Sequence, residues 1–151
     1  MPSAYKGTPE ARLALSTFIT LTRSVNAMLG QTNPMLHKEF GLTESQLAVL
    51  EAIYHLGPLC QGELGQKILR SGSNVTTVVD NLTRNGLVRR QRDAHDRRMQ
   101  IVHLTEQGRA ALSAALPGHV RRITSLMSVL SREEQQELGR ICRKLGTSIT
   151  R

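Results

Sequence analysis

The sequence is poor in aromatic residues and in cysteine. Aromatic residues make up 3% of its 151 residues, and there is no tryptophan. The core must therefore be built from aliphatic side chains and methionine, which favours packed helices over a β-sandwich. The two cysteines, Cys60 and Cys142, are too few for a disulfide framework or a zinc site. No apolar run approaches the length of a membrane span, and residues 1–7 lack the apolar core of a signal peptide, so we expect a cytoplasmic protein without a membrane partner.

The sequence also lacks the residue spacings of a catalytic or metal site. No Ser-His-Asp set, glycine-rich phosphate loop or pair of carboxylates stands in a convincing context, so we predict that the chain is not an enzyme. No histidine pairs with a carboxylate or a thiol at metal-ligand spacing; the five are His37, His55, His95, His103 and His119. We therefore expect no cofactor and no metal, with a zinc ion held across distant segments as the alternative.

Positive charge is abundant and unevenly placed. The net charge of +8 suits a polyanionic partner, although a merely soluble basic protein would also carry it. Between residues 84 and 98 there are six arginines against Asp93 and Asp96, a net charge of +4 in 15 residues. All six are arginine rather than lysine, which favours bidentate phosphate contacts and insertion into a narrow minor groove.

Apolar periodicity predicts a mainly helical fold with one small β-hairpin. Capping boxes at Thr43–Gln46 and Ser131–Glu134 mark two helix starts. Gly86 suits the left-handed position that ends a helix. We expect Pro117 to kink the helix that Thr105 caps. The first helix is expected from Pro9 and fades near Asn33-Pro34, and its apolar face continues to Gly41 through Met35, Leu36 and Phe40. The elements expected after it are helices from 44 to Gly57, 61–69 and 73–85, strands 87–91 and 99–104, and helices after Thr105 and Ser131.

The central elements form a winged helix-turn-helix. Helix 61–69, the turn at Ser71-Gly72 and helix 73–85 make the helix-turn-helix, and the hairpin after them is the wing. The outward side chains of the second helix are short and hydrogen-bonding, as a reader of the major groove requires: Ser73, Asn74, Thr76, Thr77, Asn81 and Arg84. Any surface helix has a polar face, so the arginines gathered beside this helix decide in favour of double-stranded DNA as a partner.

The outer helices carry apolar stripes that the winged unit does not need. We take residues 1–151 as a single domain, with the winged unit at 42–105 and dimerisation helices at 8–40 and 106–151. Pairing of two copies through these stripes would bury them, and packing within one chain is the alternative. The expected homodimer interface comprises Leu15, Phe18, Leu138, Ile141, Leu145 and Ile149.

Several sequence stretches resemble the MarR family of bacterial transcriptional regulators. Glu63–Gly65, Asn74–Leu82 and Asn85–Arg90 are similar to that family's helix-turn-helix and first wing strand. Asp96–Arg98 and Val102–Gly108 are similar to its wing and to the exit from the wing. The resemblance covers nearly the whole chain, and the stretch from Asp-Arg-Arg to Leu-Thr-Glu-x-Gly is the most specific part.

The resemblance implies an obligate dimer, a pseudo-palindromic operator, and release by a small molecule or an oxidant. It implies that Asp96 orients Arg98, that Arg98 enters the minor groove, and that Arg97 contacts a phosphate. The amino-acid sequence of residues 68–76 is most similar to that of the branch of the family that responds to quinones and phenols. The DNA-contact candidates are Ser71, Ser73, Asn74, Thr76, Thr77, Asn81, Arg84, Arg92, Arg97 and Arg98.

Two further sites are candidates for sensing. Cys60 lies near a predicted helix N-terminus, where a thiol becomes more reactive, so it is a candidate redox sensor; a small, partly buried structural residue is the alternative. We expect Cys142 to pack in the core. A small aromatic effector is expected where the first two helices and the fifth meet, near His37, Phe40 and Leu47.

Two functional readings follow from the residues. The first is a sequence-specific DNA-binding repressor, associated with the nucleoid when bound to DNA. The alternative is a winged helix used as a protein-interaction module, whose wing would not need six arginines.

Overall fold

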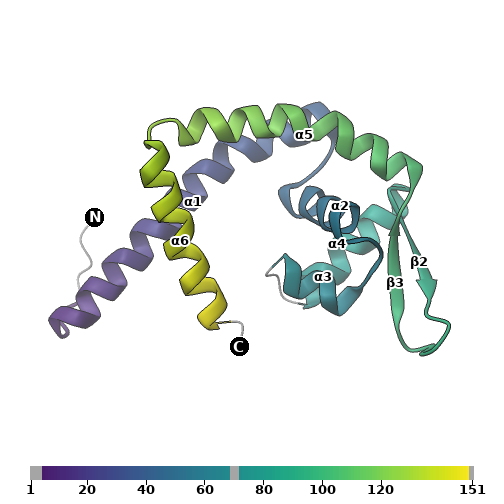
Figure 1. The fold of residues 1–151 in the computed structure, drawn as a ribbon, viewed down its shortest axis with the longest axis horizontal. Coiled ribbons are helices and arrows are strands. Elements are labelled where there is room, and N and C mark those ends of the chain that lie inside the picture. Colours follow the sequence, from purple (N-terminus) through teal and green to yellow (C-terminus); the bar gives the residue numbers. More distant parts are fainter. Residues whose placement is uncertain (1–4, 69–71, 150–151) are drawn as a thin grey trace. The chain divides into compact units, whose positions relative to one another are not determined.

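The computed structural model describes residues 5–68 and 72–149, which form six helices and three short strands (Figure 1). This mainly helical fold with a small antiparallel sheet confirms the predicted fold class. The elements are α1 (Pro9–Phe40), α2 (Glu44–Leu56), β1 (Leu59–Cys60), α3 (Gln61–Lys67), α4 (Gly72–Arg84), β2 (Val88–Arg92), β3 (Gln100–Leu104), α5 (Glu106–Met127) and α6 (Arg132–Ile149).

Both predicted capping boxes are present. At the start of α2, Gln46 N donates to Thr43 Oγ1 over 3.2 Å and Thr43 N donates to Gln46 Oε1 over 2.9 Å. At the start of α6, Ser131 and Glu134 exchange the same pair of bonds, over 2.8 and 3.2 Å. Each box satisfies two backbone donors that would otherwise lack an intrahelical partner, which is why these two helices begin where the sequence predicts.

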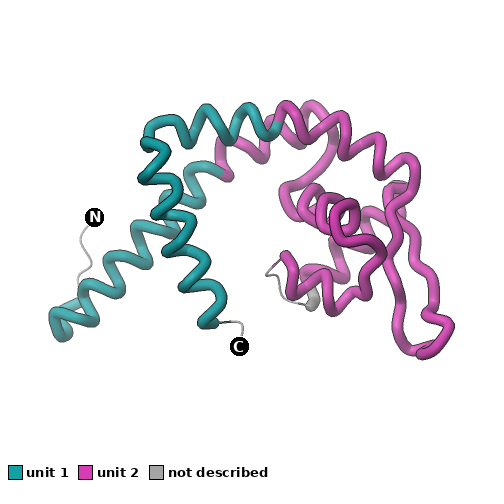
Figure 2. The backbone as a smooth tube through the Cα atoms, viewed as in Figure 1, with its two compact units in different colours: residues 1–28, 119–151 teal, residues 29–118 magenta. Residues whose placement is uncertain are grey.

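The chain divides into two compact units (Figure 2). Unit 1 comprises residues 1–28 and 119–151, and unit 2 comprises residues 29–118. Unit 2 contains all of α2, α3, α4 and the three strands, so it holds every element of the winged helix-turn-helix.

Unit 2 has a continuous aliphatic core. Its buried residues come from every helix of the unit and from the sheet: Leu36, Leu42, Leu47, Val49, Leu50, Ile53, Leu64, Val75, Val79, Leu82, Val88, Val102, Leu112 and Ala115. Val75, Val79 and Leu82 recur at steps of four and three, so α4 presents one face to this core. Its opposite face carries the exposed residues Asn74, Thr76 and Thr77.

The wing is a three-stranded antiparallel sheet in the order β1-β3-β2. The two long strands pair from Val88 opposite Leu104 to Arg92 opposite Gln100. Strand β1, in which Leu59 pairs with Val102 and Cys60 with Ile101, is not predicted by the sequence pattern. Two residues are too few to show a period, and only pairing with β3 makes them a strand.

Tight packing holds the helix after the wing against the turn before it. Gly86 has φ of 73°, as predicted, and Leu87 N donates to Leu82 O while Gly86 N donates to Thr83 O, which closes α4 with a Schellman motif. Thr105 Oγ1 donates to Gly86 O over 2.6 Å. A Cβ at Gly108 would overlap the backbone carbonyl of Leu87, so this position requires glycine.

Two prolines lie inside helices. We expected the first helix to fade near Asn33-Pro34 with its apolar face continuing to Gly41, and α1 runs without interruption through Pro34 to Phe40. Proline costs a helix about 3 kcal/mol. Here Leu36 is buried in the core of unit 2 and Phe40 packs against it, so tertiary packing offsets that cost. Helix α5 likewise continues through Pro117.

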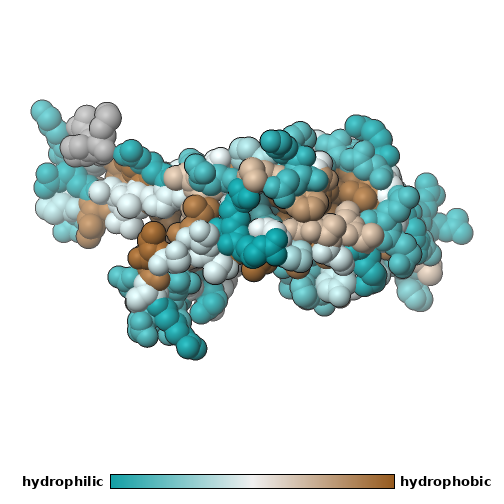
Figure 3. All heavy atoms as spheres, turned by 90° about the horizontal axis from the view of Figure 1, so that it is seen from above, coloured by the Kyte–Doolittle hydropathy of each residue, from teal (hydrophilic) through white to brown (hydrophobic). Residues whose placement is uncertain are grey.

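Unit 1 has almost no core of its own. Of its described residues only His119 is buried, and none of the residues of α6 is. Figure 3 shows apolar side chains at the surface among hydrophilic ones in this part of the molecule. Cys142, which we expected to pack in the core, is exposed on α6 for the same reason. No helix within the described residues is both long and apolar enough to cross a membrane.

Candidate nucleic-acid interface

The outer face of α4 carries the candidates for base recognition. Asn74, Thr76 and Thr77 are exposed, and Asn81 is half-buried. Arg84, exposed at the end of the helix, donates from Nη1 to Asn81 Oδ1 over 3.2 Å. Of the other predicted contacts, Ser71 and the side chain of Ser73 lie outside the described residues. The face therefore offers amide and hydroxyl groups at the spacing of successive helical turns, as major-groove readout requires.

The wing carries exposed arginines on a defined turn. Arg92, at the end of β2, is exposed, and so are Arg97 and Arg98 in the connection to β3. The side chain of Arg98 is 95% exposed. The connection is closed by two backbone bonds, from Asp93 N to Met99 O and from Met99 N to Asp96 O. These guanidinium groups are thus held on an ordered turn rather than on a loose loop.

Asp96 lies directly beside Arg98. Its Oδ1 accepts a hydrogen bond from Arg98 N over 2.9 Å and lies 3.7 Å from Arg98 Nε. The side-chain contact is within ion-pair range but longer than a hydrogen bond, so it favours one direction of a guanidinium that is otherwise exposed. This is the geometry that an orienting role for Asp96 requires.

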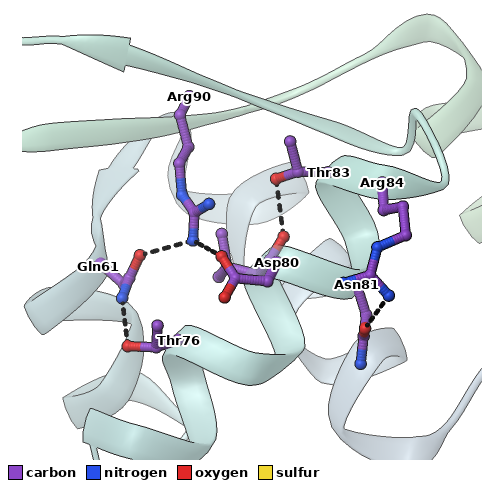
Figure 4. Close-up of polar contacts among 8 residues, drawn as sticks. Gln61, Thr76, Asp80, Asn81, Thr83, Arg84 and Arg90 are labelled. Carbon is purple, nitrogen blue, oxygen red and sulfur yellow. Dashed lines mark hydrogen bonds and ion pairs between the residues drawn. The ribbon is translucent and has the colours of Figure 1, made fainter.

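Arg90 differs from the other arginines of the wing because its side chain turns inward. Its Nη2 lies 2.6 Å from Asp80 Oδ1 on α4 and donates to Gln61 Oε1 on α3 over 3.2 Å (Figure 4). Arg90 is one of the six arginines between residues 84 and 98 but is not among the DNA-contact candidates, and its guanidinium is engaged within the protein. Asp80 is the one acidic residue of α4, so the sequence already offered a partner for an arginine of the adjacent strand.

Electrostatics at the base of the wing favour a neutral histidine. His103 on β3 is paired with Arg89 on β2. Burial lowers the pKa of His103 below its ordinary 6.5, and the positive charge of Arg89 lowers it further. His103 therefore adds no charge to the wing at neutral pH, and the arginines carry its positive field.

The candidate sensing residues lie in different environments. Cys60 is half-buried at the N-terminus of α3, where its backbone N–H donates to Glu63 Oε2 over 2.9 Å. That bond, together with a contact from the Cys60 side chain, lowers the pKa of Glu63. Among the proposed effector contacts, Leu47 is buried in the core of unit 2, Phe40 is half-buried against it, and His37 is exposed. The described residues contain no group of three or more histidines, cysteines and carboxylates that could hold a metal.

Comparison with known proteins agrees with this geometry. Residues 42–99, from the start of α2 to the turn of the wing, match the model of the MarR family. The regulator MhqR of Bacillus subtilis, an HTH-type transcriptional regulator, is 34% identical over 133 residues, which are 88% of this chain and 91% of that protein. The chain belongs to the MarR family. It is a transcriptional regulator that binds DNA.

Solved structures of MarR-like regulators share the fold. A MepR-like protein crystallised with pseudoligands is 28% identical, with a TM-score of 0.71 over 89% of this chain and 95% of that one. Sco3205 of Streptomyces coelicolor, a MarR-family regulator crystallised with DNA, is 24% identical, with a TM-score of 0.83 over 98% of this chain and 92% of that one. The family and the relatives are regulators and not enzymes, which confirms the expectation of a non-catalytic protein. They also favour DNA binding over the protein-interaction alternative.

Proposed function

We propose that this MarR-family chain is a homodimeric repressor that leaves a pseudo-palindromic operator when a small phenolic or aromatic compound, or an oxidant, acts on it. The observation that carries the proposal is the lack of a core in unit 1, together with the apolar stripe of α6. Leu138, Ile141, Leu145 and Ile149 recur at steps of three and four and are 39–72% exposed. A second copy would bury this stripe by isologous pairing.

Such a dimer would place two copies of α4 in successive major grooves. The recognition helices of a two-fold dimer must be about 34–36 Å apart to reach two half-sites on one face of the duplex. Exposed Asn74, Thr76 and Thr77 would read bases, while Arg98, oriented by Asp96, would enter the adjacent minor groove. Arg92 and Arg97 would contact phosphates. The chain would act in the cytoplasm, where bacterial DNA lies.

The effector would act by changing the spacing of the two helices. We place a phenolic or aromatic compound at the junction of α1, α2 and α5, beside Phe40, because the sequence resembles the phenol- and quinone-responsive branch of the family. In one form of the dimer the two copies of α4 would not match successive major grooves. A ligand that binds this form more tightly by about 2–3 kcal/mol would weaken operator binding roughly 30–150-fold. By linkage, the operator must weaken binding of the ligand by the same factor.

An oxidant would act instead at Cys60. A peroxide would convert the thiol to a sulfenic acid and leave as water or an alcohol. Cys60 is paired with Ile101 of β3 and caps α3, so added bulk on its sulfur would disturb the base of the wing. The modification would then lie in unit 2 beside the strands of the wing, which supports an effect on DNA binding.

One titration tests the effector mechanism. The wild-type chain first enriches a duplex from a random-sequence library, and fluorescence anisotropy then gives its affinity for that duplex. Salicylate, simple phenols and quinones are titrated into free protein and into the complex. Release of the duplex, with weaker ligand binding to the complex, supports the proposal. A compound that binds tightly and equally to both forms would contradict it, and the compounds that bind to neither are eliminated as effectors.

A further inference from the structure

A chain of polar contacts joins the wing to both helices of the helix-turn-helix. It runs from Asp80 on α4 to Arg90 on β2, on to Gln61 on α3, and back to Thr76 on α4 (Figure 4). The three contacts measure 2.6, 3.2 and 2.7 Å. We call these four residues the polar relay. It closes a ring that includes α3, α4 and β2.

Burial marks Arg90 as an internal member of the relay. Its side chain is 25% exposed, against 95% for Arg98 at the wing tip, and its Nε is shielded from solvent. Its guanidinium is already engaged by Asp80 and Gln61. A phosphate could recruit Arg90 only by breaking an ion pair and a hydrogen bond, so the other arginines of the wing are the better phosphate ligands.

The amide of Gln61 can take only one orientation in this ring. A guanidinium has donors and no acceptor, so the side that faces Arg90 must be the carbonyl oxygen Oε1. The amino group Nε2 then faces Thr76 and donates to Oγ1. Gln61 therefore sets the position of one candidate base-reading side chain according to the position of the wing strand.

We propose that Arg90 and Gln61 are positioning residues for sequence recognition, which lock the recognition helix to the wing strand. This rests on the placement of α4 in the major groove under the proposed function. The lock acts on specificity, because base readout needs α4 in one register against the duplex whereas general attraction to phosphates does not. Loss of the lock will lower affinity for a cognate duplex while leaving affinity for unrelated DNA nearly unchanged.

The test compares three single variants, and the Arg90→Met/Gln61→Ala double variant, on two probes. The probes are the duplex enriched by the wild-type chain and a scrambled duplex of the same composition. Arg90→Met removes the centre of the relay, and Gln61→Ala removes both of its own bonds but leaves Arg90 paired with Asp80. Arg92→Met is the matched control, because it removes the same charge from an exposed position on the same strand. Anisotropy gives each affinity over a range of salt concentrations, and thermal melting checks the fold.

The relay predicts that two variants lose specificity and the control does not. Arg90→Met and Gln61→Ala should each lower the ratio of cognate to scrambled affinity about 10-fold, the effect of a charge-assisted hydrogen bond, and the double variant should lose no more than the larger single loss. Their salt slopes should match wild type. Arg92→Met should weaken both duplexes alike and reduce the salt slope by about 0.9, as the loss of one phosphate contact does.

Other outcomes would overturn the inference. If Arg90→Met behaves like Arg92→Met, with a reduced slope and an unchanged ratio, Arg90 is a phosphate ligand. If Arg90→Met melts below the assay temperature, Gln61→Ala decides alone, and an unchanged ratio for that variant refutes the lock. If the wild-type chain enriches no duplex at all, the proposed placement of α4 fails, and that result is distinct from a failure of the relay.

Discussion

The apolar stripe of α6, through which we propose that two copies pair, allows a quantitative prediction for Leu145→Asp. Leu145 is 49% exposed in the single chain. Burying the exposed half of this side chain in each of two copies removes about as much apolar surface from water as burying one whole leucine. That burial stabilises the dimer by about 1.5–3 kcal/mol. The aspartate also places an unpaired charge in the contact from each side, which adds to the loss. We therefore expect the dissociation constant of the dimer to rise by more than about 30-fold.

Light scattering after size exclusion measures this directly. At micromolar concentration the wild type should show about twice the chain mass of 16.7 kDa, and Leu145→Asp should shift toward that mass itself. Gln136→Asp is the control, because Gln136 is exposed on the opposite face of α6 and the change adds the same charge. A wild-type monomer, or a Leu145→Asp dimer as stable as the wild type, would refute the assignment of the stripe.

Three further predictions concern the wing and the thiols. Arg98→Ala should cost about 1–3 kcal/mol of DNA affinity and remove any preference for A·T-rich flanks, measured by anisotropy on flank variants; wild-type affinity at all salts would contradict it. Gly108→Ala should lower the free energy of unfolding by about 1–3 kcal/mol, since its Cβ overlaps the Leu87 carbonyl, and an unchanged urea midpoint would show that the backbone yields. If Cys60 is the sensor, peroxide should release DNA from the wild type and from Cys142→Ser but not from Cys60→Ser; equal release from all three would exclude it.

Local rules of sequence were enough to predict most of the elements. The capping boxes at Thr43 and Ser131 and the left-handed Gly86 act within a few residues, so the chain itself encodes where those helices begin and end. The change of period after Gly86 likewise revealed the hairpin. The positive charge of the wing could be predicted by counting arginines in the sequence, because exposed arginines attract phosphates without a partner within the protein.

Only the tertiary structure decided which side chains of that charged segment face inward. Arg90 and Arg92 are two residues apart on one strand, and both are arginine, yet one is paired with Asp80 and the other is exposed. The continuation of α1 through Pro34 and the existence of β1 depend in the same way on distant partners, the core of unit 2 and strand β3. Each of these outcomes depends on a local conformational cost and on contacts with residues far along the chain. A pattern of neighbouring residues reports the local cost but not the distant contacts.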